Sequence, residues 1–151
     1  MTLKQLKNTL TDLFQSSDAV EEKLQKTCEL LQSNVAYYDW VGFYFADHNH
    51  KTLHLGAYAG LPTDHTVIPF GKGICGQVAE SNQTFVVDDV AAQDNYISCN
   101  INVKSEIVVP IFVNGTNIGQ IDIDSNTLNA FSKEDREFLE WLTREAGEII
   151  P

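Results

Sequence analysis

Apolar residues recur every three or four positions at both ends of the chain, which is the spacing of one helix face. Near the start, the pattern predicts two helices separated near residues 16–17, the first preceded by a capping box at Thr2 and Gln5. A third helix is predicted after Ser132, a residue suited to cap it. The positions that define these faces are Leu3, Leu6, Leu10, Leu13 and Phe14, then Val20, Leu24, Cys28, Leu31 and Val35, and finally Phe138, Leu139, Leu142, Ala146 and Ile149.

Between these helices the pattern changes to the alternation that is typical of half-buried strands. Residues 40–45 and 53–59 predict an antiparallel hairpin across a polar turn. Asn114-Gly115 lies between the strand-like residues 107–113 and 116–124, and this dipeptide is a strong signal for a second hairpin. The two hairpins together predict an antiparallel sheet.

The chain between the hairpins is less regular. Residues 60–69 predict a loop, 74–80 a short helix and 85–87 a short strand, whereas the polar stretch 88–102 is typical of an irregular segment. Helices, hairpin, irregular middle, hairpin and helix follow one another in the order of an α+β fold. We expect an antiparallel sheet with the N- and C-terminal helices on one face and a loop-roofed pocket for a small molecule on the other.

Composition and charge limit what the chain can bind. Its 151 residues are 43% hydrophobic, which suits a single domain over residues 1–151, with helices over 1–36 and the core of the domain over 37–151. A formal net charge of −11 disfavours nucleic acid and anionic membranes. The first residues lack the pattern of a signal peptide and no apolar run is long enough to span a bilayer, so we expect a cytoplasmic protein.

The sequence contains three cysteines, Cys28, Cys75 and Cys99. This low, odd number argues against a disulfide framework and leaves room for a reactive thiol. Cys28 lies on the apolar face of the second helix and is expected in the core. Cys75 follows Gly73 at the start of a predicted helix, where the helix dipole could lower the pKa of its thiol. No cysteine stands at zinc-ligand spacing from a histidine, and the sequence lacks the G-K-[ST] ending of a phosphate loop. We therefore expect no metal and no nucleotide chemistry.

Two acids of the last strand are candidates for a buried site. Asp122 and Asp124 are separated by one apolar residue and share a strand face, and carboxylates in one pocket should raise at least one pKa. A strict two-residue turn at Asn114-Gly115 would place Glu106 opposite Ile123, on the other face. The three acids converge only if a bulge shifts the register or if Glu106 precedes the regular strand. The alternative is a set of solvated acids at a strand end.

An ordered series of motifs runs from residue 40 to the C-terminal helix. It comprises Trp40-Val41-Gly42-Phe43-Tyr44, Phe70-Gly71-Lys72-Gly73-Ile74-Cys75-Gly76, Asp88-Asp89-Val90, Tyr96-Ile97-Ser98-Cys99, Lys104-Ser105-Glu106-Ile107-Val108-Val109-Pro110 and Ile118-Gly119-Gln120-Ile121-Asp122-Ile123-Asp124-Ser125. The series resembles GAF domains. A cysteine before an S-E-I-V-x-P strand, with D-I-D-S on the next strand, is similar to the free methionine-(R)-sulfoxide reductases in that family.

The resemblance implies reduction of free L-methionine (R)-sulfoxide to methionine, with no bound cofactor. In such a reaction the Cys99 thiolate attacks the sulfoxide sulfur, and methionine leaves behind a cysteine sulfenic acid. The resemblance further implies that the three acids converge, that Glu106 protonates the sulfoxide oxygen, and that Asp122 and Asp124 hold the substrate ammonium. Taken from the residues alone, an unreactive loop cysteine is the favoured interpretation of Cys99, and its position within the resembled motif is what indicates the nucleophile.

An aromatic pair completes the implied site. Trp40 and Tyr44 share a face of the first strand and would form a wall for the S-methyl group of the substrate. The alternative for this pair is ordinary core packing.

Regeneration of the thiol leaves two routes open. The family commonly carries a further cysteine ten residues before Cys75, where this chain has His65. Either Cys75 acts as the resolving thiol and pairs with Cys99, or an external thiol reduces the sulfenic acid directly. Thioredoxin or a similar dithiol is the reductant that the resemblance implies.

Two functions of other classes stand beside the enzyme. A GAF domain can bind a small ligand without chemistry, or it can sense oxidation, here through Cys75 and Cys99. The sequence carries no kinase, cyclase or DNA-binding segment, which favours the enzyme. GAF domains often pair through helices, so the two N-terminal helices are candidates for a homodimer interface.

Overall fold

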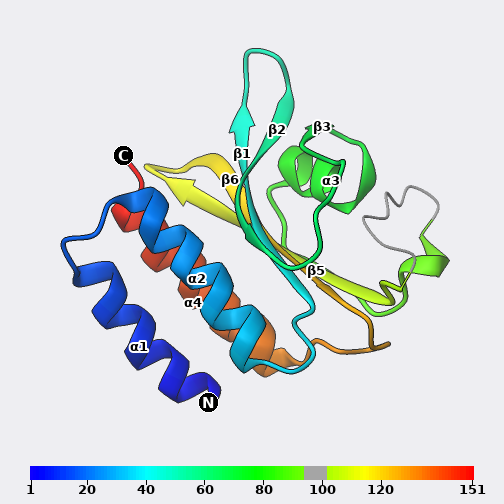
Figure 1. Cartoon of the computed structure of the whole chain (residues 1–151). Helices are drawn as coiled ribbons and strands as arrows, with labels where there is room; N and C mark the ends of the chain where they lie inside the picture. The colour runs from blue at the N-terminus through cyan, green and yellow to red at the C-terminus, as the bar shows by residue number, and fades with distance from the viewer. Residues whose placement is uncertain (94–101) are drawn as a thin grey trace.

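The computed structural model describes residues 1–93 and 102–151 (Figure 1). Helices α1 (Leu3–Gln15) and α2 (Val20–Asn34) begin the chain, and α4 (Lys133–Ile149) lies at its end. This order confirms the predicted α+β fold. The elements between the helices are β1 (Trp40–Asp47), β2 (Thr52–Ala59), β3 (Val67–Pro69), α3 (Gly73–Ser81), β4 (Phe85–Val87), the 3-10 helix η1 (Val90–Ala92), β5 (Ser105–Val113) and β6 (Thr116–Ser125).

The strands of the described residues form one six-stranded antiparallel sheet in the order β3-β2-β1-β6-β5-β4. Both predicted hairpins are present, as β1–β2 and β5–β6. They are joined through β1 and β6, where Trp40 lies opposite Asp124 and Tyr44 lies opposite Gln120. This central pairing brings together residues that are about eighty positions apart in the sequence.

The two faces of the sheet carry separate apolar clusters. Helices α1, α2 and α4 cover one face, as predicted, and α3 lies against the other (Figure 1). On the helix-covered face, the sheet residues of the core are Val41, Phe43, Ile107, Val109, Ile111, Ile121 and Ile123. On the opposite face, the cluster includes Trp40, Tyr44, Leu53, Ile68, Ile74, Cys75, Val78, Val90 and Val108.

Side-chain caps fix the ends of two helices. Thr2 and Gln5 form the predicted capping box of α1. Ser132 caps α4 in a second box with Asp135, whose carboxylate also accepts hydrogen bonds from the hydroxyls of Tyr37 (2.8 Å) and Tyr38 (2.6 Å). These bonds tie the start of α4 to the segment that enters β1. None of the helices in the described part of the chain has the length and apolar character to cross a membrane.

An extra residue in β6 decides which side chains share a face. The Asn114-Gly115 turn has two residues, as predicted, but the register shifts beyond it because Ile118 has no residue opposite it in β5. Glu106 therefore lies opposite Asp124 and not opposite Ile123. A single-residue bulge reverses the face of every residue beyond it, relative to a strict pairing.

The structure differs from the prediction in the segment 60–69, which we expected to be a loop. Its last three residues form β3, which pairs with β2 at the sheet edge. Ile68, the buried residue of this strand, packs into the cluster under α3. A strand of three residues is too short to produce an alternating pattern that the sequence could reveal.

Candidate functional site

Three central strands align polar side chains on the sheet face away from the terminal helices. Trp40 of β1 lies opposite Asp124 of β6, which in turn lies opposite Glu106 of β5. Asp122 precedes Asp124 by two positions in β6, so its side chain points to the same face of the sheet. The bulge therefore meets the condition for convergence, and the three carboxylates gather over the sheet centre.

All three acids are withdrawn from water. The exposed fraction of Glu106 is 5%, and Asp122 and Asp124 are each 2% exposed. Burial raises the pKa of Asp122, because an ionised carboxylate loses its hydration in the interior, while hydrogen bonds to Glu106 and Cys75 act in the opposite direction. We predicted a raised pKa from mutual repulsion; the direction is confirmed, but the main cause is loss of solvent.

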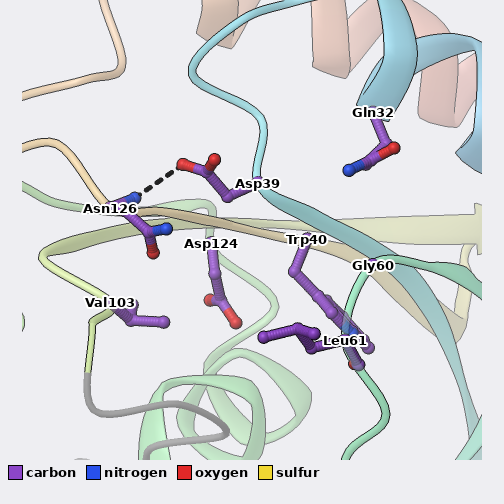
Figure 2. Close-up of a pocket in the computed structure, with 8 residues that line it drawn as sticks. All are labelled: Gln32, Asp39, Trp40, Gly60, Leu61, Val103, Asp124 and Asn126. Carbon is purple, nitrogen blue, oxygen red and sulfur yellow. Dashed lines mark hydrogen bonds between the residues drawn. The ribbon is translucent and has the colours of Figure 1, made fainter.

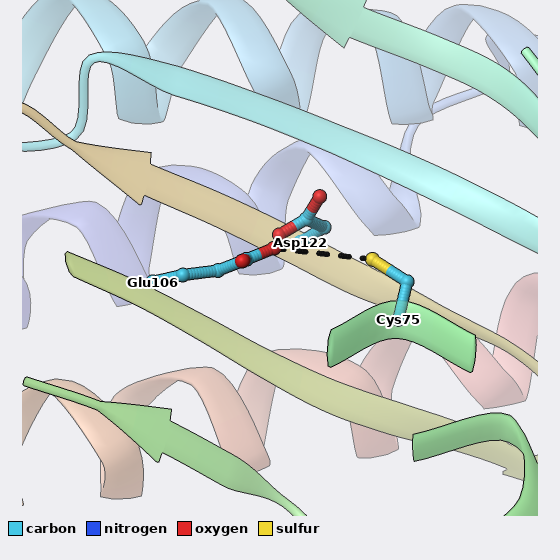
Figure 3. Close-up of side chains that lie close together, drawn as sticks. All are labelled: Cys75, Glu106 and Asp122. Carbon is cyan, nitrogen blue, oxygen red and sulfur yellow. Dashed lines mark hydrogen bonds between the residues drawn. The ribbon is translucent and has the colours of Figure 1, made fainter. Parts of the chain in front are cut away.

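Cys75 approaches the acids from α3. Its Sγ donates a long hydrogen bond of 3.9 Å to Oε2 of Glu106, and Figure 3 shows the three side chains of Cys75, Glu106 and Asp122 converging. Burial, followed by the negative charges of Asp122 and Glu106, raises the pKa of the Cys75 thiol well above its usual value. The expected lowering by the helix dipole is therefore wrong, because the dipole of a short helix does not offset burial beside carboxylates.

Gln120 is a buried polar residue of the site that the sequence analysis missed. It is fully buried, and its Nε2 donates a 3.1 Å hydrogen bond to the carbonyl of Cys75, which fastens α3 to β6. Oε1 of Gln120 and Oδ1 of Asp122 are buried and lack a hydrogen-bond partner within the described residues. Gln120, Asp122 and Asp124 follow one another at alternate positions, so the strand pattern already contained this signal.

The aromatic residues form a wall beside the acids. The rings of Trp40 and Tyr44 lie 6.4 Å apart, and Tyr58 stacks on Trp40 at 5.7 Å. Trp40 Nε1 donates to the carbonyl of Leu61 (3.0 Å), which holds the indole in place. The indole also lies over Gly42, where a Cβ would collide with it. Trp40 and Tyr44 therefore belong to the site face, as the resemblance implied, and Tyr58 is an addition.

A cavity of about 310 Å³ opens beside this wall (Figure 2). Asp39 accepts a 2.8 Å hydrogen bond from the backbone of Asn126, which closes the cavity edge between the start of β1 and the end of β6. The lining contains carboxylates and amides but no lysine or arginine among the described residues. It consists of Gln32, Asp39, Trp40, Gly60, Leu61, Val103, Asp124 and Asn126.

A smaller cavity adjoins the thiol. It is lined in part by His65, Cys75, Glu106 and Asp122. The carbonyl of His65 accepts a 2.9 Å hydrogen bond from the hydroxyl of Tyr44, which fixes the segment 60–69 over the site. Atoms of Cys75, Glu106 and Asp122 that could ligate a metal all lie within 4.8 Å of one another. The search for histidine–cysteine spacing in the sequence did not anticipate this group.

Six of the seven predicted site residues meet on one sheet face. They are Trp40, Tyr44, Cys75, Glu106, Asp122 and Asp124. The seventh, Cys99, lies outside the described residues. Val103, four positions after Cys99 in the sequence, is buried and lines the larger cavity.

Comparison with known proteins identifies relatives of the same architecture. Residues 17–150 match the family model of the GAF domain. The free methionine-R-sulfoxide reductase of Escherichia coli (strain K12) is 34% identical over 127 residues, which covers 84% of this chain and 75% of that protein. The protein of the same name from Saccharomyces cerevisiae is 42% identical over 108 residues, or 70% of this chain and 59% of that protein.

A solved structure agrees with these relatives. The free methionine-R-sulfoxide reductase of Neisseria meningitidis, solved in complex with its substrate, is 35% identical. It superposes with a TM-score of 0.85 over 97% of this chain and 84% of that one. The similarity therefore extends over the helices and both hairpins, including the strands that carry the buried acids.

Proposed function

The chain belongs to the GAF domain family, and we propose that it reduces free L-methionine (R)-sulfoxide to L-methionine. The observation that carries the proposal is the convergence of Glu106, Asp122 and Asp124, all buried, beside the Trp40–Tyr44 wall. Burial of three acids at one point is costly for the fold, which is a feature of sites that have a chemical task. The similarity of the chain to free methionine-R-sulfoxide reductases also supports the proposal.

The anionic face selects a small cationic group. Asp122 and Asp124 hold the ammonium of the substrate, while the S-methyl group packs against Trp40 and Tyr44. A methionine sulfoxide within a polypeptide has an amide in place of the ammonium and cannot make this ion pair. The carboxylates of Asp39 and Asp124, which line the larger cavity, support the same preference.

The chemical step transfers oxygen from the substrate to a cysteine. The Cys99 thiolate donates an electron pair to the sulfoxide sulfur, and Glu106 protonates the sulfoxide oxygen. The oxygen is transferred to the Cys99 sulfur, which becomes a sulfenic acid, and the substrate sulfur leaves as the thioether of methionine. The substrate is reduced by two electrons and Cys99 is oxidised by two.

Regeneration of Cys99 consumes a dithiol of the thioredoxin type. In one route the Cys75 thiol attacks the sulfenic acid, which forms a disulfide and releases water, and the dithiol then reduces the disulfide. In the other route the external thiol attacks the sulfenic acid itself. The high pKa of the Cys75 thiol makes it a slow nucleophile in the resting protein, which favours direct reduction.

The experiment that tests the reaction is turnover of free L-methionine (R)-sulfoxide with excess dithiothreitol. We expect methionine from the parent and from the control Cys28→Ser, because Cys28 lies in the core on the helix side. Cys99→Ser should form none. No methionine from the parent, or equal rates in the parent and Cys99→Ser, would overturn the proposal.

The same assay separates the two routes of regeneration. Cys75→Ser should retain its rate with dithiothreitol in both routes. With thioredoxin as the sole reductant, the rate falls only if Cys75 resolves the sulfenic acid. The control is again Cys28→Ser, which removes the other buried thiol of the described residues.

We also propose that the chain forms a homodimer through its N-terminal helices. A groove of about 560 Å³ between α1 and α2 contains Leu13 and Leu30 in a partly polar lining. Contact between two copies would remove these side chains from water. Light scattering should give twice the mass of the chain, and Leu30→Glu should restore the mass of a monomer. A monomeric parent would contradict the proposal.

A further inference from the structure

One thiol and two carboxylates meet beneath α3 with the spacing of metal ligands. The ligand atoms of Cys75, Glu106 and Asp122 all lie within 4.8 Å of one another, and Sγ is 3.9 Å from Oε2 of Glu106 (Figure 3). Around a tetrahedral zinc ion, sulfur and oxygen ligands stand about 3.6 Å apart, from bond lengths of roughly 2.3 and 2.1 Å. We propose that these three residues bind a thiophilic divalent cation such as Zn²⁺ and that the bound cation blocks the site.

Unpartnered oxygens point to a ligand at this place independently of the ligand spacing. Asp122 is 98% withdrawn from solvent, with an exposed fraction of 2%, and its Oδ1 lacks a hydrogen-bond partner within the described residues. Oε1 of the adjacent Gln120, whose amide holds the Cys75 carbonyl, is in the same condition. Buried acceptors in native proteins are almost always matched by a donor or an ion. A cation at Asp122 meets this need, which the hydrogen-bond partners of its other carboxylate oxygen leave unmet.

The hydrogen-bond partners of Asp122 have the wrong sign to satisfy it. Its side-chain hydrogen bonds are to Glu106 and Cys75, two groups that themselves become anionic when deprotonated. The same cavity is also lined by His65, a residue type that zinc favours, and by Lys72. A thiolate with carboxylates selects zinc or cadmium over magnesium and calcium, which prefer oxygen alone.

The consequence for the proposed reaction is inhibition, and this part rests on the proposed function. On binding, the Cys75 sulfur forms a bond to the cation and its proton is released to solvent, with no change of oxidation state. The cation also occupies the carboxylates of Glu106 and Asp122. Glu106 then has no proton to donate, and Asp122 no longer attracts the ammonium of the substrate.

The test uses Cd²⁺ as the probe, because a cadmium–thiolate bond gives a charge-transfer absorption in the ultraviolet. The Cys99→Ser variant of the chain retains Cys28 and Cys75 as its cysteines, and both are buried. Titration of the reduced protein, freed of added thiols, should give one Cd²⁺ per chain and a charge-transfer band. Adding Cys75→Ser should abolish the band, whereas adding Cys28→Ser should leave it unchanged.

Variants of the acids test the rest of the ligand set. Asp122→Asn and Glu106→Gln keep the side-chain shape and should each weaken Cd²⁺ binding by at least about tenfold. An exposed control, Glu145→Gln, should bind as the parent does. Absence of the band in the parent would overturn the proposal, as would a band that needs Cys28 or one that ignores both acid variants. Circular dichroism confirms that each variant is folded.

Competition with substrate distinguishes this inference from the proposed function. If both hold, free L-methionine (R)-sulfoxide should shift the Cd²⁺ titration of the Cys99→Ser protein to higher concentrations, and Zn²⁺ should inhibit parent turnover. Cadmium binding through Cys75 without competition by substrate would retain the metal site and overturn the claim that the cation blocks the site, whereas absence of parent turnover would remove the reductase alone. Turnover without the cadmium band would remove the metal site alone.

Discussion

Neighbouring residues of strand β6 point alternately to two environments that both exclude water, one apolar and the other lined by acids. Ile121 and Ile123 are fully buried against the terminal helices, and Asp122 and Asp124 are 98% buried, with 2% exposed, on the other face. The isoleucines gain free energy from leaving water, whereas the aspartates lose their hydration. The helix side therefore stabilises the fold, and the pocket side uses part of that stability to hold acids in a reactive arrangement.

The largest effect on stability and turnover is expected from a change in the register between β5 and β6, which decides the face to which each side chain points. Insertion of one alanine between Ile121 and Asp122, beyond the bulge, would place Glu106 opposite Ile123 and turn Asp122 and Asp124 toward the apolar core. We expect loss of the cooperative thermal transition in circular dichroism and of turnover. The control Ile118→Ala keeps the residue count and should retain both. Parent-like unfolding and turnover of the insertion variant would mean that the register between β5 and β6 does not assign the faces.

Next in size is the loss of the proton donor on the pocket face. Glu106→Gln keeps the shape of the side chain and removes its acid, so kcat should fall by about 10²- to 10⁴-fold, the usual contribution of general acid catalysis. The free energy of unfolding should change little. Glu145→Gln, an exposed substitution on α4, is the matched control and should turn over like the parent. A kcat within about twofold of the parent would assign protonation to another group.

The helix face should respond in the opposite sense. Ile123→Ala leaves a cavity among fully buried apolar side chains and should lower the free energy of unfolding by about 2–5 kcal/mol. Turnover by the folded fraction should persist at low temperature, because the side chain points away from the acids. Urea unfolding measures the loss, and the half-exposed Val67→Ala is the control, with a change below about 0.5 kcal/mol. Equal losses in the two variants would contradict the separation of the faces.

The smallest effect is a gain in stability on the pocket face. Asp122→Asn removes a buried charge and should raise the free energy of unfolding at neutral pH by about 1 kcal/mol. Because burial raises the pKa of folded Asp122 above 3.8, the folded state binds its proton more tightly than the unfolded state does. Parent stability therefore falls as pH rises from 3.8 through the folded pKa, and below 3.8 this cost is absent.

The pH dependence provides the check on that sign. With a chelator present, urea unfolding of the parent and of Asp122→Asn should differ at pH 7 and converge near pH 3.5. Asp122→Asn should also lose turnover, since it no longer binds the substrate ammonium. A variant less stable than the parent at pH 7 would mean that the carboxylate is stabilising where it lies.

The alternation of polar and apolar residues predicted most of the fold, because the terminal helices bury one face each and the strands of both hairpins point alternate side chains to opposite faces of the sheet. It also placed Trp40 with Tyr44 and Asp122 with Asp124, since these pairs lie within single strands. The resemblance to reductases supplied Glu106 and Cys75, which periodicity could not connect to the others. Cys99 lies outside the described residues, so its role as the nucleophile stays a prediction.

The sequence did not reveal features that depend on contacts between different strands. Ile118 looks like any other apolar strand residue, and only its missing partner in β5 identifies it as the bulge. The direction of the Cys75 pKa shift was wrong for a similar reason, because the acids that raise it arrive from strands 31 and 47 positions away. Long-range neighbours decide both features, and local patterns do not contain them.

The offset that the extra residue creates between β5 and β6 also constrains how this chain can diverge. A lineage that gained or lost one residue between Ile118 and Asp122 would turn the two aspartates toward the isoleucines of the core, a change that costs several kcal/mol and removes the fold before the chemistry. A lineage that first exchanged Glu106 for an apolar residue would keep its fold and lose only the acid. Descendants should therefore lose the acid more readily than the spacing, so those that retain the glutamate should also retain the number of residues between the bulge and the aspartates.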